Sequence, residues 1–86
     1  MAPAEQTKSM CVGGVLMHVG QKVKIALEGN DVLYGKIDSF REIYPGTPVA
    51  FWLVTVDVDA AYHHLTLGCR YFGTTTEAGG CISLLD

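Results

Sequence analysis

The chain has 86 residues, of which 49% are hydrophobic and 17% charged, and its 6 Lys and Arg against 9 Asp and Glu give a net charge of −3. A chain of this length forms one domain with a small core, and a body with so few charges leaves apolar surface that self-association would bury. Phosphate binding draws on Lys and Arg, so the acidic balance excludes a general attraction to nucleic acid and requires a local concentration of these residues.

The N-terminal segment divides into a polar leader and an apolar stretch. Residues 1–8 are polar, contain a proline and are expected to form a loose leader, which leaves 9–86 as a single domain. Ser9 would cap a short helix over 10–19. The apolar face of that helix would consist of Met10, Val15, Leu16 and Val19.

The stretch 10–19 also has an alternative structure. Gly13 and Gly14 disfavour a helix by about 1 kcal/mol each relative to Ala, so an irregular or strand-like arm is the rival. Gly20 ends the segment in either case. The stretch is too short to span a bilayer, which takes ~20 apolar residues. It also lacks the basic region and the cleavage site of a signal peptide.

Three cysteines, Cys11, Cys69 and Cys81, form an odd set without a CxxC spacing. This pattern predicts neither a disulfide framework nor a zinc site. The expected role is that of small buried hydrophobes in a reducing compartment. With the absence of a membrane-spanning stretch, this predicts a soluble cytoplasmic protein without a membrane partner.

Residues 20–40 carry the strongest pattern in the chain. The apolar face is formed by Val23, Ile25 and Leu27 in the first half and by Leu33, Gly35 and Ile37 in the second. A two-residue period of this kind indicates half-buried strands. The tight turn between them, 28–31, contains Gly and Asn, which tolerate positive φ angles. A bulge before Phe40 would return that residue to the apolar face, and the strand glycine predicts a bend or a close backbone approach.

The middle of the chain predicts a loop and a strand. Pro45 and Pro48 lie in 41–48, and proline cannot continue a ladder of hydrogen bonds, so this segment is expected to be a loop. Residues 49–58 are rich in Val, Phe and Trp and form the strongest strand by composition. Both of its faces are largely apolar, which predicts burial by the core on one side and by a neighbouring subunit on the other.

The last third predicts two more strands. A fourth strand is expected over 62–72, with a bend at Gly68, followed by a flexible polar loop over 73–80 and a short final strand over 81–85. The complete pattern predicts an all-β fold with a possible short N-terminal helix: five strands in a strongly bent, antiparallel, SH3-like barrel.

This order of elements resembles the Sm/LSm family of ring-forming, RNA-binding proteins. The positions that match its first motif are Gly20, Val23, Ile25, Leu27, Gly29, Leu33, Gly35, Ile37 and Phe40. The closing segment 80–84, GCISL, is similar to the end of the second motif, where a glycine opens the last strand. The resemblance implies an Sm-like barrel after an N-terminal helix.

The resemblance also implies partners. In the Sm/LSm arrangement the fourth strand of one protomer pairs with the fifth strand of the next and closes a ring. The expected partner is therefore the chain itself, in a homo-oligomeric ring of roughly five to seven subunits. Single-stranded RNA is the second expected partner.

The residues at the first implied RNA-binding loop depart from the family pattern. Arg41 stands where an aspartate is expected, and no asparagine follows in the loop. Arg41 and Tyr44 would still contact a phosphate and stack on an unpaired base. The alternative is that Arg41 pairs with Glu42 or Asp38 while Tyr44 packs the loop against the barrel.

A second candidate contact lies near the loop before the final strand. The family commonly carries Arg-Gly there, but no arginine precedes Gly79 and Gly80. Arg70 and Thr74 are the nearest residues able to contact a nucleotide or phosphate from that side. The alternative is that the threonines after Gly73 form a solvated turn.

Other chemistry has little support in the sequence. His63 and His64 would point to opposite faces of a strand, so one chain is not expected to chelate a metal ion with them. Asp57 and Asp59 are expected to solvate a turn, and no catalytic motif or cofactor signature is present. Two functions stay open: a ring that binds single-stranded RNA, and a structural or protein-interaction oligomer that keeps the barrel without RNA binding.

Overall fold

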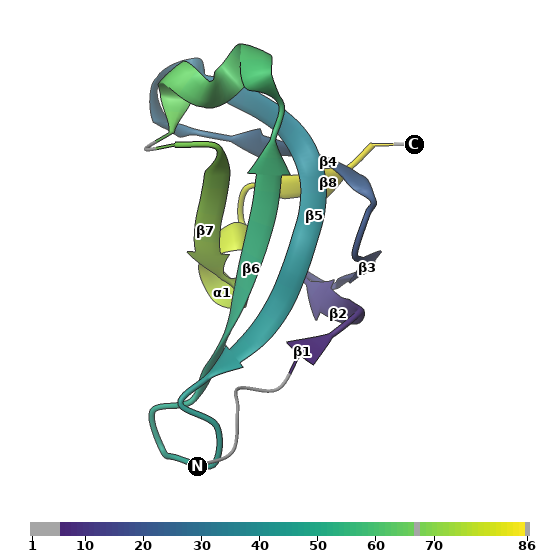
Figure 1. The fold of residues 1–86 in the computed structure, drawn as a ribbon, viewed down its shortest axis with the longest axis vertical. Helices are drawn as coiled ribbons and strands as arrows, with labels where there is room; N and C mark the ends of the chain where they lie inside the picture. The colour runs from purple at the N-terminus through teal and green to yellow at the C-terminus, as the bar shows by residue number, and fades with distance from the viewer. Residues whose placement is uncertain (1–5, 67, 86) are drawn as a thin grey trace.

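The computed structural model of the protein describes residues 6–66 and 68–85 and shows a small all-β fold (Figure 1). The strands are β1 Gln6–Thr7, β2 Ser9–Val12, β3 Val15–His18, β4 Lys22–Ala26, β5 Val32–Ile43, β6 Phe51–Val58, β7 Arg70–Thr74 and β8 Ile82–Leu84. Two 3₁₀ turns, η1 Glu28–Asn30 and η2 Ala60–Leu65, and one short helix, α1 Thr75–Ala78, complete the described elements.

One bent antiparallel sheet organises the molecule. Its strand order is β7-β6-β5-β4-β8, and β1 pairs with the far end of β5. Figure 1 shows β5 as a long curved strand that runs the length of the molecule, with η2 near one end of the sheet and the loop after β5 at the other. The five-stranded antiparallel fold expected from the sequence is thereby confirmed.

The β4–β5 hairpin forms as its sequence pattern predicts. Its turn contains Gly29 at φ 75° and Asn30 at φ 69°, a left-handed region that these two residue types tolerate. The register of β5 against β6 shifts between Ile37 and Ser39, so a bulge lies where the pattern required one. The shift returns Phe40 to the buried side, where it is fully enclosed.

The core lies on the concave side of the bent sheet. The buried hydrophobic residues are Val12, Met17, Val23, Ile25, Leu33, Ile37, Phe40, Val54, Val56, Val58, Ala78 and Ile82. Most come from alternate positions of β4, β5 and β6, as the two-residue period of a half-buried strand requires. Val12, Met17 and Ala78 come from outside the main sheet, so β2, β3 and α1 help to close the core.

The helix expected over 10–19 is wrong, and the strand-like alternative is closer. Strands β2 and β3 form a hairpin whose turn residues, Gly13 and Gly14, have φ angles of 61° and 82°. A two-residue turn with positive φ at both positions suits a β-hairpin, and glycine adopts these φ angles without steric strain. Gly20 ends the segment at φ 91°. Of the leader 1–8, residues 1–5 lie outside the described part, and Gln6–Thr7 pair with β5.

Three expectations for the middle and last thirds need correction. The loop predicted to start at residue 41 starts later, because β5 continues to Ile43 opposite Phe51. The fourth strand starts at Arg70, since η2 takes up residues 60–65, and the loop predicted over 73–80 contains α1. The final strand is confirmed as β8. No helix in the described ranges is long and apolar enough to span a membrane.

Candidate functional site

The register of the sheet places most lysine and arginine side chains on the face opposite the core, here called the outer face. Residues directly opposite each other on paired strands share a face. The outer face therefore carries Lys22 and Lys24 of β4, Lys36, Ser39 and Arg41 of β5, Leu53, Thr55 and Asp57 of β6, and Arg70, Phe72 and Thr74 of β7. Five of the six Lys and Arg residues of an acidic chain thus gather on one side.

Arg41 and Tyr44 lie at the end of this face, next to the loop between β5 and β6. Arg41 is exposed on β5, opposite Leu53 on one side. Tyr44 is 61% exposed, and its ring packs edge-on against Phe51 with 6.3 Å between centroids. The packing of Tyr44 agrees with the structural alternative in part, yet most of the ring surface stays accessible to a ligand.

Arg41 does not form the ion pair that the structural alternative required. Asp38 instead lies 3.8 Å from Arg70, and both side chains of that pair are close to half exposed. No other ion pair within 4.0 Å occurs in 6–66 and 68–85. Among these residues, Arg41 has no carboxylate within 4.0 Å of its guanidinium, whereas Arg70 has that of Asp38 beside it.

Thr74 lies at the same end of the sheet as Arg41, because both are opposite Leu53. Its hydroxyl accepts a hydrogen bond from the backbone N–H of Glu77 and donates one to the Glu77 carboxylate, each at 3.1 Å. Thr74 is thus the N-cap of α1, and the spacing Thr-x-x-Glu is a capping signal that the sequence contained. The solvated turn expected after Gly73 is a helix instead.

Arg70 lies away from the other three candidates. Arg70 is the first residue of β7 and lies opposite Asp57 of β6, which lies opposite Lys36 of β5. Thr74 is the last residue of β7. Four residues of extended strand separate Arg70 from Thr74 by about 13 Å. The structure therefore brings Arg41, Tyr44 and Thr74 to one end of the sheet and leaves Arg70 near the other.

Two exposed aromatic residues were not expected to contribute to a site. Phe72 points from the middle of β7 onto the outer face and is 59% exposed, while Phe51 lies beside Tyr44. The sequence reading assigned Phe51 to the core or an interface. Neighbouring residues of a strand point to opposite faces, so Phe72 points to the outer face because Gly73 is buried. The sequence pattern did not show this, because the predicted strand began at residue 62, eight residues before β7 begins.

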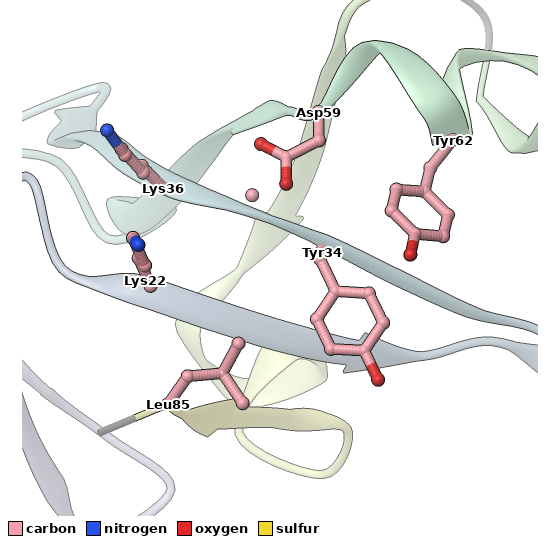
Figure 2. Close-up of a pocket in the computed structure, with 7 residues that line it drawn as sticks. Lys22, Tyr34, Lys36, Asp59, Tyr62 and Leu85 are labelled. Carbon is pink, nitrogen blue, oxygen red and sulfur yellow. The ribbon is translucent and has the colours of Figure 1, made fainter.

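A pocket of about 210 Å³ lies on the β4–β5 part of the outer face (Figure 2). Lys22 and Lys36 are directly opposite each other on β4 and β5. Asp59 points toward the same space, and the rings of Tyr34 and Tyr62 lie side by side with 5.3 Å between their centroids. No local sequence pattern predicts this pocket, because residues that follow β6 and β8 complete it.

The remaining polar candidates have other roles. His63 and His64 lie in η2 and not on a strand, and a ring nitrogen of His63 is 2.8 Å from the carbonyl oxygen of Val58. Within the described residues, no three His, Cys, Asp or Glu side chains gather as metal ligands. The three cysteines are free, and Cys11 and Cys69 are exposed, so the expectation that the cysteines are buried is wrong for these two.

Comparison with known proteins identifies no relative: no family model, no curated protein and no solved structure matches the chain.

Proposed function

We propose that the protein is a homo-oligomeric ring of the Sm-like type that binds single-stranded RNA at the end of the sheet near Tyr44. The observation that carries the proposal is the pair of open edges, because β7 and β8 lie at opposite ends of the strand order. Within the described residues neither strand has a partner on its outer side. An unpaired edge is a template for another chain, and two complementary edges per protomer build a closed ring by head-to-tail contacts.

The surroundings of β7 support burial by a neighbour. Phe72 is a large exposed aromatic residue on an edge strand, which is unfavourable for a monomer. An apolar pocket of about 320 Å³ lies beside the same strand, lined by Leu27, Leu65, Thr66, Arg70, Tyr71 and Phe72. On the other edge, β8 is short and contains Ile82 and Leu84. Strand pairing between protomers would satisfy the backbone groups of both edges and cover this apolar surface.

The RNA site in this proposal consists of Arg41, Tyr44 and Phe51. An exposed aromatic ring gives a stacking surface for an unpaired base, and stacking of this kind contributes about 1–3 kcal/mol per base. Arg41 supplies a guanidinium without a carboxylate within 4.0 Å in the described structure. A ring would repeat the cluster once per subunit around its axis, and this repetition provides the local concentration of arginine that an acidic chain otherwise lacks. A cytoplasmic, reducing location suits the three free cysteines.

The second candidate function is a structural or protein-interaction oligomer without RNA binding. Two observations favour it: Thr74 is engaged as the cap of α1, and Arg70 is paired with Asp38. Under this hypothesis the open edges keep their role and the residues near Tyr44 stabilise the loop. The two candidates therefore agree on the oligomer and differ on RNA.

The ring is tested by molar mass. Light scattering at tens of micromolar is expected to give roughly five to seven times the chain mass of 9.3 kDa. Phe72→Asp should lower the mass to that of the monomer, because it places a charge in the proposed interface. Tyr44→Asp is the matched control, since Tyr44 is equally exposed but belongs to neither edge strand, and it should leave the mass unchanged. A wild-type mass near 9.3 kDa would refute the ring.

RNA binding is tested by filter-binding titration with U-rich and A-rich oligonucleotides at low and moderate salt. We expect saturable binding that weakens as salt is raised, because phosphate contacts release counterions. If no binding occurs at low salt while the oligomer is intact, the RNA function is wrong and the structural oligomer is favoured.

A further inference from the structure

The pocket of Figure 2 places two like charges side by side, with the carboxylate of Asp59 also in its lining and Asp57 opposite Lys36 on β6. Lys22 and Lys36 are cross-strand partners, and like charges placed directly opposite each other destabilise a sheet. No carboxylate within the described residues lies within 4.0 Å of either ammonium group. An anion bound between the two lysines would remove the repulsion and gain two charge-assisted hydrogen bonds.

The walls of the pocket are fixed by backbone hydrogen bonds. The N–H of Asp59 donates to the carbonyl of Tyr34 at 2.9 Å, which holds the segment after β6 beside β5. On the other side, the N–H of Leu85 donates to the carbonyl of Lys22 at 2.9 Å and holds the segment after β8 beside β4. The pocket is therefore preformed by three parts of the chain that are distant in sequence.

The lining residues restrict the class of ligand. Two ammonium groups favour a dianionic group such as a phosphomonoester over a singly charged carboxylate. Asp59 would repel a ligand that is anionic throughout, but its carboxylate accepts a hydrogen bond from a hydroxyl. Tyr34 and Tyr62 add an aromatic wall. The volume of about 210 Å³ is below the ~300–1,000 Å³ of common ligand pockets, so the ligand is small.

We propose that this pocket binds a small phosphomonoester of a sugar or polyol, with Lys22 and Lys36 on the phosphate and Asp59 on a hydroxyl group. The site is separate from the RNA contacts at Arg41 and Tyr44, which lie at the far end of β5, and it adjoins the β8 edge through Leu85. A ribose that carries a 5′-phosphate contains the required groups, either as a free sugar phosphate or at the end of a nucleic-acid chain.

The experiment is a titration of the isotope-labelled protein with ribose 5-phosphate, followed by NMR. Saturable shifts of the backbone signals of Lys22, Tyr34, Lys36 and Asp59 are expected, with weaker binding of inorganic phosphate and none of ribose. A dinucleotide with a 5′-phosphate, compared with the same dinucleotide with a 5′-hydroxyl, separates the two sources. Absence of saturable shifts at these residues with ribose 5-phosphate would overturn the proposal.

Variants separate a built site from diffuse surface charge. Lys36→Gln is expected to weaken ribose 5-phosphate binding about tenfold, since it removes a charged hydrogen bond. Lys24→Gln is the matched control: it lies on the same face of β4 but does not line the pocket, and it should change the affinity less than about twofold. Equal losses in the two variants would overturn the site. Asp59→Asn should reduce the preference for ribose 5-phosphate over inorganic phosphate, and an unchanged preference would contradict the role of Asp59.

Discussion

The backbones of Gly13 and Gly79 are in direct contact, where the turn of the β2–β3 hairpin meets the end of α1. A Cβ atom on Gly13 would lie 2.5 Å from the carbonyl oxygen of Gly79, and one on Gly79 would lie 2.9 Å from the backbone nitrogen of Gly13. The contact joins two elements that both contribute to the core, one carrying Val12 and the other Ala78.

Substitution at Gly79 tests this contact. Gly79 has φ −58°, so alanine is not strained there, and Gly79→Ala should destabilise the protein by about 2 kcal/mol through the clash with the Gly13 backbone. Gly80→Ala is the control, because its nearest neighbour is 3.7 Å away. Chemical denaturation measures both. Equal stability of the two variants would mean that the elements separate at little cost.

Substitution of Gly35 should be more damaging. A Cβ at this position would press against the carbonyl oxygen of Asp57 and lie 3.0 Å from Val58 Cα, and both atoms belong to the backbone of the neighbouring strand β6. We expect Gly35→Ala to cost about 3 kcal/mol in the free energy of unfolding. Lys36→Ala, an exposed neighbour on the same strand, should change it by less than about 1 kcal/mol. A similar small loss in both variants would contradict the close approach of β5 and β6.

The cap of α1 predicts a smaller effect. Thr74→Ala removes the hydroxyl that accepts from the Glu77 N–H and should cost about 1 kcal/mol of stability. Thr76→Ala, at an exposed position inside the same helix, serves as the control and should be close to neutral. Thermal melts compare the two. If Thr74→Ala lowered RNA affinity without lowering stability, Thr74 would act as a ligand contact and not as a cap.

The proposed RNA site predicts different effects of the two outer-face arginines. Arg41→Ala should lower RNA affinity about tenfold and leave the oligomer mass unchanged, because it removes a charged contact beside Tyr44. Arg70→Ala should have a weaker effect, since that side chain is paired with Asp38 near the other end of the sheet. Filter binding and light scattering are measured on the same samples. Collapse of the oligomer in Arg41→Ala would assign that arginine to structure.

Because of the raised pKa of the Tyr71 phenol, we expect the free energy of unfolding to fall at alkaline pH. Burial, with smaller contributions from Cys81 and Glu77, raises the pKa of Tyr71 from 10.0 to about 12. The folded state thus holds this proton more tightly than the unfolded chain, and the stability it contributes is complete below about pH 10 and lost as the pH rises toward 12. With solvent screening the loss is about 1 kcal/mol.

Denaturation on both sides of this pH window measures the loss. Tyr71→Phe should show a smaller fall in stability than the wild type, because it has no phenol to ionise. Tyr44→Phe, at an exposed position, should keep the wild-type fall. A fall of the same size in Tyr71→Phe as in the wild type would show that other groups cause it.

Local patterns predicted the β4–β5 hairpin well because its signals act over a few residues. Alternating apolar side chains, a Gly-Asn turn and a bulge before Phe40 each constrain the backbone where they occur. The same reasoning missed the β2–β3 hairpin, since the apolar stretch 10–19 fits a helical face as well as two short strands. The glycine pair at 13 and 14 disfavours a helix, and positive φ at both positions makes it a hairpin turn in the structure.

The candidate site was predictable in its parts but not in its arrangement. Arg41 and Tyr44 were identified from their sequence positions, whereas the separation of Arg70 from Thr74 depended on where β7 begins. The predicted fourth strand begins too early, because residues 62–65 resemble strand residues in composition. In the structure these residues belong to η2, and the ring of Tyr62 packs against that of Tyr34.

The sequence by itself determined the all-β class, the central hairpin, the strand glycine at 35 and the final strand, since each depends on the period of apolar residues or on backbone freedom within a short segment. The tertiary structure alone decided which charges meet. Register across four strands gathered five cations on the outer face, set Lys22 opposite Lys36 and brought Gly13 against Gly79. Such contacts depend on how distant segments pack, and the long-range pairing that fixes them leaves no local pattern in the chain.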